Sequence, residues 1–286
     1  MRGLIALFLL AASGMAAAQP AAASPRDACG EVVKIATHDG TTTPYAYTPA
    51  QGMPATDTPV TLVLLVGGGG YVDLDDRGCP QLLSRNALIR MSPLFRQVGM
   101  ATALVDAPSD MRGDEGLGGF RIAAGHADDL GRVIADLRAR TRGTVWIAGH
   151  SRGTLSAANT AARLTGSSAP DGVVLLSAMM VGDARAKKPW VAQTLFSVDL
   201  EAIRVPLLLV GHAADNCVRS PPDLMATVAT KTRGARQQAV TVTGGPVPAG
   251  RPPGLAACEV REPHDFVTQE AELAAGMMRF IRGGSY

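Results

Sequence analysis

A serine in the middle of the chain has the neighbours that a catalytic nucleophile needs. The segment Gly149-His150-Ser151-Arg152-Gly153 fits the pattern G-x-S-x-G. In that pattern the serine occupies a sharp turn between a strand and a helix, and the flanking glycines let the backbone bend tightly. The preceding TVWIA has the pattern of a buried strand, and the following SAANTAARL that of a helix. We therefore predict that Ser151 is a nucleophile. The alternative is a serine that only caps a helix.

A nucleophilic serine needs a general base and a carboxylate that orients this base, in the chain order Ser, Asp or Glu, His. Asp215 follows an apolar segment, at a strand end where catalytic groups gather in α/β proteins. His264 follows it in the segment EPHDF. We predict Asp215 as the orienting carboxylate and His264 as the base. The rival carboxylates are Asp199, Asp223 and Glu259. The remaining histidines are expected to be structural or supporting: His38, His126, His150 and His212.

A run of four glycines, Gly67–Gly70, follows the apolar segment Val60–Val66. Glycines at this place expose backbone N–H groups that can stabilise a developing oxyanion. The second donor would be the N–H of Arg152, the residue after the nucleophile. Phosphate binding is the rival reading of a glycine run, but no G-K-[ST] follows and neither G-x-G-x-x-G register is completed. A plain tight turn is the remaining alternative.

Strand and helix patterns alternate around these residues. Apolar runs typical of buried strands occur at Val60–Val66, Met100–Val105, Thr144–Ala148, Gly172–Leu176 and Val205–Val210. Further strands are expected at Glu31–Thr37, Thr43–Tyr47 and Gln238–Thr243. Helices are expected at Ala87–Val98 (interrupted near Pro93), Arg121–Thr141, Ser151–Leu164, Pro222–Thr230 and Asp265–Ile281. This alternation predicts an α/β fold, with a mostly parallel central sheet and helices on both faces.

The start of the chain has the pattern of a sorting signal. Met1-Arg2 is followed by an uncharged apolar run, and Ala16-Ala17-Ala18 offers a cleavage site before Gln19. This order is typical of a secretory signal peptide, and the run is too short for a stable membrane span. We predict a signal peptide over residues 1–18 and a single domain over residues 19–286, exported to the periplasm or the extracellular space. An uncleaved membrane anchor is the alternative.

Composition and cysteine count narrow the function further. The chain of 286 residues is 47% hydrophobic and has a formal net charge of +2, which disfavours both disorder and nucleic-acid binding. Four cysteines in an exported chain suggest two disulfides, and four cysteines allow three connectivities.

Asp73–Gly78 has the carboxylate density of a calcium loop, but Ser84 stands where an EF-hand needs Glu. We expect neither a metal nor a cofactor.

These motifs together resemble the α/β-hydrolase superfamily over nearly the whole mature length. The resemblance rests on VGGGGY, GHSRG, HAAD and EPHDF in this order. It implies a nucleophile at Ser151, an acid at Asp215 and a base at His264. It places oxyanion donors at Arg152 and in the region of Gly69 and Gly70. The chain departs from the H-G-G-G motif of lipases and esterases in having Gly67 at the histidine position. With no room for a large cap domain, it is most similar to compact dienelactone-hydrolase-like or cutinase-like members.

The resemblance also bears on the cysteines. If Asp215 and His264 meet at one site, their loops must be neighbours, and Cys217 and Cys258 lie in these loops. A Cys217–Cys258 disulfide would clamp them together, as in secreted cutinase-like members. Cys29 and Cys79 then pair by exclusion.

The predicted function is an exported serine hydrolase that cleaves small-molecule or polymeric carboxylic esters through an acyl-enzyme. The alternatives are a peptidase, thioesterase or lactonase with the same triad, and a binding protein on a catalytically inactive hydrolase scaffold.

Overall fold

The computed structural model describes residues 29–286 apart from 53–56, 233–235, 247–251 and 260–261. The predicted signal peptide, residues 1–18, lies outside the described residues, as does the start of the predicted domain 19–286. Within the described ranges, no helix has both the length and the apolar character needed to cross a bilayer.

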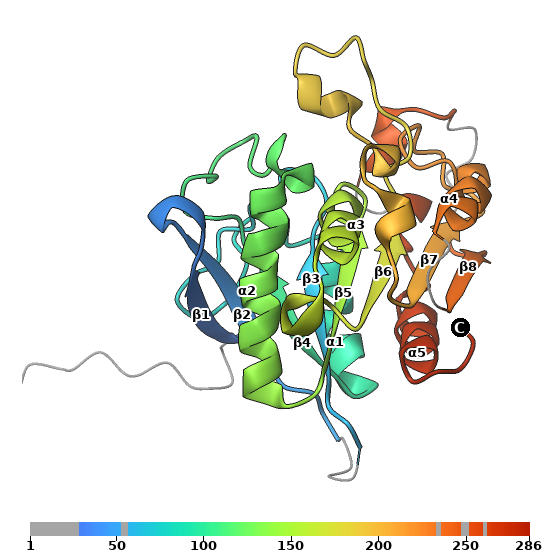
Figure 1. The fold of residues 1–286 in the computed structure, drawn as a ribbon. Helices are drawn as coiled ribbons and strands as arrows, with labels where there is room; N and C mark the ends of the chain where they lie inside the picture. The colour runs from blue at the N-terminus through green and yellow to red at the C-terminus, as the bar shows by residue number, and fades with distance from the viewer. Residues whose placement is uncertain (1–28, 53–56, 233–235, 247–251, 260–261) are drawn as a thin grey trace, which may run out of the picture.

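Eight strands form one sheet (Figure 1). Their bounds are β1 Glu31–Ala36, β2 Thr42–Thr48, β3 Val60–Leu65, β4 Met100–Val105, β5 Thr144–His150, β6 Gly172–Leu176, β7 Leu207–His212 and β8 Gln237–Val242. Their order across the sheet is β1-β2-β4-β3-β5-β6-β7-β8. The pairs β1–β2 and β2–β4 are antiparallel, and every pair from β4 to β8 is parallel. The prediction of a mostly parallel sheet is confirmed.

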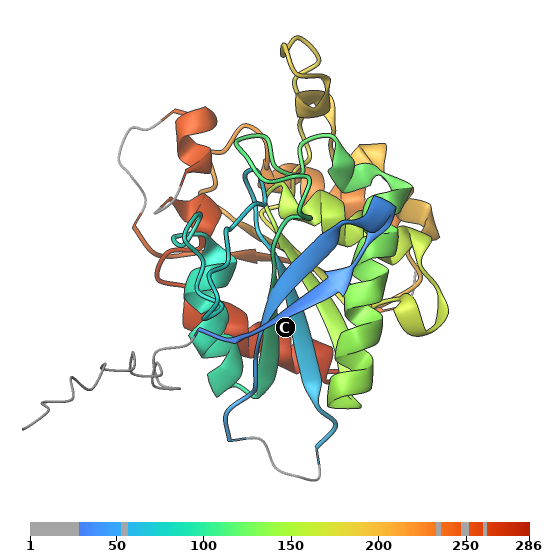
Figure 2. The ribbon, with the colours of Figure 1, turned by 90° about the vertical axis from the view of Figure 1, so that its left-hand side faces the viewer.

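Helices cover both faces of this sheet (Figure 2). The helices are α1 Ala87–Gln97, α2 Ala124–Thr141, α3 Gly153–Arg163, α4 Met225–Lys231 and α5 Glu270–Ile281. Helices α2, α3 and α4 bury side chains in one apolar cluster, and α1 and α5 bury theirs in the other. The predicted helices on both faces are therefore confirmed.

The central strands are apolar throughout because both of their faces are covered. Successive side chains in a strand point to opposite faces. In β3, Val63 and Leu65 face the cluster with α2 and α3, whereas Leu62 and Leu64 face the cluster with α1 and α5. All six residues of β3, β4 and β7 are buried.

Several predicted helices differ from the structure in their bounds: α3 begins at Gly153 rather than Ser151, and α4 at Met225 rather than Pro222. Three further differences have a clear physical reason. Helix α1 continues through Pro93 without interruption, because its buried apolar face holds it against the sheet although Pro93 lacks an N–H donor. Helix α2 begins at Ala124, since Ala123 has an extended backbone. The terminal helix begins at Glu270, because Phe266 and Thr268 adopt positive φ values of 54° and 71°.

Candidate active site

Ser151 lies at the turn between β5 and α3, at the carboxyl edge of the sheet. Its φ is +54°, in the left-handed region that non-glycine residues rarely adopt. Its backbone N–H donates to Leu176 O over 2.9 Å, which fixes the turn to the neighbouring strand β6. Ser151 borders a surface cavity of about 370 Å³. The predicted nucleophile is therefore held in a sharp turn and faces open space.

The two glycines of the G-x-S-x-G pattern are needed for close backbone approach. A Cβ on Gly149 would lie 2.4 Å from Gly153 O, and a Cβ on Gly153 would lie 2.0 Å from Leu65 O. Both distances are too short for any side chain, and backbone atoms cannot give way cheaply. The glycines let α3 begin directly against the end of β3 and so make the turn possible.

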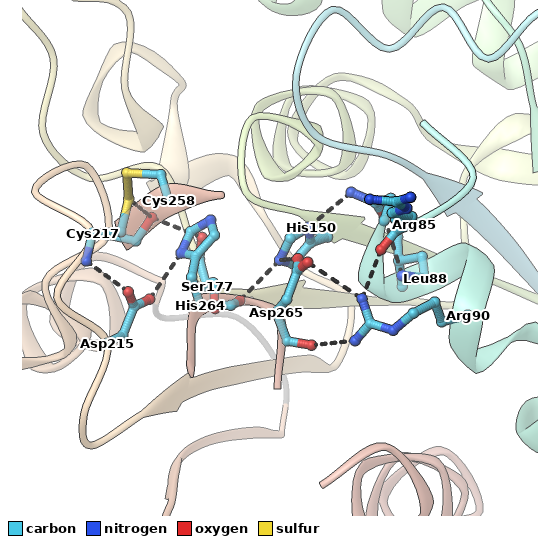
Figure 3. A network of polar contacts seen from close by, with 12 residues as sticks. Arg85, Leu88, Arg90, His150, Ser177, Asp215, Cys217, Cys258, His264 and Asp265 are labelled. Carbon is cyan, nitrogen blue, oxygen red and sulfur yellow. Dashed lines mark hydrogen bonds and ion pairs between the residues drawn. A yellow bond between two sulfur atoms is a disulfide. The ribbon is translucent and has the colours of Figure 1, made fainter. Parts of the chain in front are cut away.

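Asp215 and His264 form a buried hydrogen-bonded pair (Figure 3). Asp215 follows β7, and His264 lies in the short 3₁₀ turn Pro263–Asp265. His264 Nδ1 lies 2.9 Å from Asp215 Oδ2, and both side chains are 1% exposed. The carboxylate accepts the Nδ1 proton, so the neutral ring carries its lone pair on Nε2. Nε2 is buried and has no hydrogen-bond partner among the described residues. This nitrogen is available to take a proton.

The backbone of His264 is anchored to the residue before Ser151 and to the end of the neighbouring strand β6. Its carbonyl accepts hydrogen bonds from Ser177 Oγ over 2.7 Å and from His150 Nε2 over 3.0 Å. His150 directly precedes Ser151. Ser177 directly follows Leu176, and the carbonyl of Leu176 accepts the N–H of Ser151. The structure thus brings the loops of the three predicted catalytic residues to one edge of the sheet. No hydrogen bond joins Ser151 Oγ to His264 within the described residues. Such contacts commonly tighten only when substrate binds.

His150 connects the start of α1 to this turn. Asn86 accepts from Leu88 N at the start of α1 and places its Nδ2 3.1 Å from His150 Nδ1. The amide donates, so His150 carries its proton on Nε2, where it donates to the carbonyl of His264. Burial lowers the pKa of His150 to about 4, although the nearby Asp265 carboxylate opposes this shift. A neutral His150 suits this role because Nδ1 then accepts from Asn86 while Nε2 donates to the carbonyl of His264.

An ion-pair cluster extends the same network (Figure 3). Arg90, on α1, lies 3.3 Å from Asp265 Oδ2 and 3.0 Å from Glu270 Oε1. Asp265 Oδ1 lies 3.4 Å from His150 Nε2. These contacts join α1, the turn that carries His264 and the start of α5. Sequence reasoning expected a supporting role for His150 but missed Asn86, Arg90, Ser177 and Asp265. Only Asn86 had a local signal, as a residue type that favours helix N-caps.

Two disulfides are present, with the pairing that the resemblance favoured. Cys217 and Cys258 are joined at an S–S distance of 2.07 Å, and Cys29 pairs with Cys79. The backbone N–H of Cys217 also donates to Asp215 Oδ1 over 2.8 Å. The first disulfide therefore links the loop of Asp215 to the segment that precedes His264.

The glycine run Gly67–Gly70 lies beside the serine turn, and its N–H groups differ in their hydrogen bonding. Gly67 and Gly68 border the same cavity as Ser151, and a Cβ on Gly67 would lie 3.0 Å from Ser151 Cβ. Gly70 N–H donates to Gly67 O over 3.1 Å and is thereby occupied within the turn. Gly69 faces the backbone of the 114–115 segment. The N–H of Gly70 is therefore already engaged, whereas those of Gly68 and Gly69 form no hydrogen bond among the described residues.

The backbone and side chain of Arg152 have separate surroundings. Its backbone N–H forms no hydrogen bond among the described residues and lies directly after Ser151. Its guanidinium lies over the Trp190 ring, 4.1 Å from the ring centroid. Burial, with the charge of Arg219, lowers the pKa of Arg152 to about 10, so the side chain stays charged at neutral pH. The guanidinium is thus engaged by Trp190, through its ring and its carbonyl, and the backbone N–H has no partner within the described ranges.

The chain is similar to known proteins in structure and not in sequence. No family model and no curated protein matches the sequence. XC6422 from Xanthomonas campestris, a member of the α/β serine hydrolases without a lid, has 17% identity and a TM-score of 0.53, covering 88% of this chain and 93% of that chain. Esterase Est2 from Thermogutta terrifontis has 17% identity and a TM-score of 0.55, covering 89% and 92%. Puromycin hydrolase has 14% identity and a TM-score of 0.59, covering 89% of this chain and 39% of that chain.

The chain has the α/β-hydrolase fold. In an α/β-hydrolase, the nucleophile turn, the acid and the histidine lie at the carboxyl edge of the sheet in this chain order. Ser151, Asp215 and His264 occupy those places after β5, β7 and β8.

Three residues at this edge are of types that can ligate a metal ion. Within the described ranges, the ligand atoms of Asp215, Cys217 and His264 lie within 4.8 Å of one another. The Cys217 sulfur is bonded to Cys258 and offers no thiolate. The Asp215 carboxylate and the His264 imidazole are hydrogen-bonded to each other. This set suits a proton relay in the α/β-hydrolase fold better than a metal centre.

Proposed function

We propose that this protein is a serine hydrolase that cleaves carboxylic esters through an acyl-enzyme. The observation that carries the proposal is the buried His264, held by Asp215 with Nε2 unpartnered, at the sheet edge where Ser151 projects from a sharp turn. The fold supports it, because structures with this fold include the Thermogutta terrifontis esterase and the lidless Xanthomonas campestris serine hydrolase.

The proposed mechanism has two steps. His264 Nε2 takes the proton of Ser151 Oγ as this oxygen attacks the ester carbonyl, and Asp215 stabilises the imidazolium that forms. The protonated His264 then gives its proton to the leaving alcohol. Water, activated by the same imidazole, attacks the acyl-enzyme and releases the acid.

The proposed oxyanion hole consists of the backbone N–H groups of Gly68 and Arg152. Gly68 borders the cavity beside Ser151, and neither N–H has a hydrogen-bond partner among the described residues. Backbone donors fixed in advance need no reorganisation when the tetrahedral oxyanion forms, which makes them effective in catalysis.

We also propose that the protein is exported. The leader pattern of residues 1–18 supports this. Two disulfides agree with an oxidising compartment. The proposed substrate is a small-molecule or polymeric ester, reached through the open cavity beside Ser151.

Turnover of p-nitrophenyl esters by wild type, Ser151→Ala and the exposed control Ser167→Ala tests this function. We expect Ser151→Ala to lose activity and labelling by a fluorophosphonate probe, and Ser167→Ala to keep both. A wild-type protein that the probe does not label would instead indicate a binding protein on a hydrolase scaffold. A panel of matched ester, thioester, lactone and amide substrates then compares the bond types, since puromycin hydrolase is among the similar structures.

A further inference from the structure

A single arginine lies buried behind the proposed oxyanion turn. Arg121, in the 3₁₀ turn Phe120–Ile122, is 1% exposed and is the largest fully buried side chain of the described residues. No ion pair of Arg121 is present within the described ranges. Burial, with the charge of Arg152, lowers the pKa of Arg121 to about 9, which leaves it charged at neutral pH. A buried charge without a carboxylate is unfavourable, so its compensating contacts are informative.

Those contacts hold the glycine turn by its carbonyl groups. Arg121 Nη2 donates to Val66 O over 3.1 Å and to Gly68 O over 3.2 Å. The carbonyl between them, Gly67 O, accepts from Gly70 N–H. In a trans peptide the N–H points opposite to the C=O. Each carbonyl shares its peptide with the N–H of the next residue, so Arg121 fixes the N–H groups of Gly67 and Gly69. These two peptides flank the one that carries the Gly68 N–H, whose own carbonyl, Gly67 O, is held by Gly70.

The same guanidinium reaches the helix that starts at the nucleophile. Arg121 Nη1 donates to Ser156 Oγ on α3 over 2.9 Å. In return, Asn159 Nδ2, also on α3, donates to the backbone carbonyl of Arg121 over 3.2 Å. Helix α3 begins one residue after Arg152, the other proposed donor. One side chain thus connects the two backbone segments that supply the two N–H groups.

The turn is shaped to admit this side chain. Gly70 has φ of +80°, and a Cβ there would lie 2.5 Å from Arg121 Nη2. The positive charge lies on the carbonyl side of the two peptides that flank the Gly68 N–H, and so holds both neighbours of the proposed donor.

We propose that Arg121 is a positioning residue for the oxyanion hole: it sets the relative placement of the Gly68 and Arg152 N–H groups and does not itself touch substrate. This assignment rests on the proposed esterase function. A positioning role affects the tetrahedral transition state and not ground-state binding, which separates it from a purely structural role.

The test compares Arg121→Met with wild type and with the control Arg138→Met. Arg138 also donates to two backbone carbonyls, Ser167 O and Ala169 O, but these lie away from the site. We expect Arg121→Met to lower kcat by about 100-fold, as loss of one oxyanion donor does, with KM changed less than about threefold. The Ki of a boronic acid that forms an anionic tetrahedral adduct should rise by a similar factor. Arg138→Met should lose stability but keep kcat.

Equal kcat losses in the two variants, or a raised KM with unchanged kcat, would overturn the assignment.

If Arg121→Met does not fold, Ser156→Ala tests the proposal instead, because this variant removes only the hydroxyl that accepts from Arg121 Nη1. We expect that variant to lower kcat at constant KM, and an unchanged kcat would overturn the proposal. Ser151→Ala is measured alongside. If Ser151→Ala kept its activity, the esterase function and the role of Arg121 would both be overturned. If turnover depended on Ser151 but Arg121→Met had the kcat of the wild type, only the role of Arg121 would be overturned.

Discussion

The Cys217–Cys258 disulfide gives a prediction in which stability and activity separate. The double variant Cys217→Ser/Cys258→Ser removes a bridge with a sequence separation of 41 residues, and Cys29→Ser/Cys79→Ser one with a separation of 50. In the loop-entropy model both losses lower the free energy of unfolding by about 4 kcal/mol. The Cys29–Cys79 variant is therefore a matched control for stability.

The two variants should differ in activity because only one bridge borders the triad. Asp215 accepts from Cys217 N on one carboxylate oxygen and pairs with His264 on the other. Without the disulfide, this loop and the segment before His264 are free to separate. A displacement of about 1 Å at a catalytic group lowers kcat by about 100-fold. We expect a loss of about 10- to 100-fold for the Cys217–Cys258 variant and about twofold or less for the control.

The assay pairs urea unfolding with ester kinetics at a temperature where both variants are fully folded. The expected pattern is similar stability losses with unequal kcat. If both double variants retained the kcat of the wild type, the clamp would have no role in positioning Asp215 and His264, and the reasoning would be refuted. Equal losses of kcat would also refute it, because they would mean that general destabilisation lowers activity.

Three further predictions concern the turn and its surroundings. Gly153→Ala should destabilise the protein by about 3 kcal/mol or more and abolish turnover, because the new Cβ would lie 2.0 Å from Leu65 O; thermal unfolding and ester kinetics check it. Arg152→Ala should keep kcat within about threefold, since the proposed donor is its backbone N–H, and a loss of about 100-fold would place the guanidinium in catalysis. The free energy of unfolding should fall as the pH is lowered from 6.5 towards 4, because the unfolded chain binds a proton that the buried His150, with its pKa lowered to about 4, does not. The contribution is about 3 kcal/mol, and denaturant titrations should show this slope reduced in His150→Gln.

The sequence predicted best what local chemistry determines. Strands β3 to β7 followed from continuous apolar runs, because a strand covered on both faces has no polar side. The G-x-S-x-G turn followed from glycine spacing, and the structure shows that both glycines are required by contacts with nearby backbone. The helix boundaries were less accurate. Arg121 fits the periodicity of an amphipathic helix, yet its backbone precedes α2 and its side chain turns inward.

The donors of the oxyanion turn show why other features could not be read from the chain. Four consecutive glycines are equivalent in sequence, so the pattern cannot say which N–H faces the serine. The answer depends on distant partners: Arg121 holds the carbonyls of Val66 and Gly68, and Leu117 N–H holds that of Gly69. These partners lie about 50 residues further along the chain. No local signal marks them.

The placement of His264 follows the same physical logic. Its side chain is oriented by Asp215, but its backbone is held by His150 and Ser177, which perform no chemistry. Both contacts end on the carbonyl of the base, so they fix the position of the residue and leave Nε2 free. The carbonyls of the glycine turn are also held by hydrogen bonds, and the N–H of Gly68 has no partner within the ranges that the structure describes. The supporting side chains Arg121, His150 and Ser177 therefore engage backbone carbonyls, and the atoms proposed to react have no hydrogen-bond partner among the described residues.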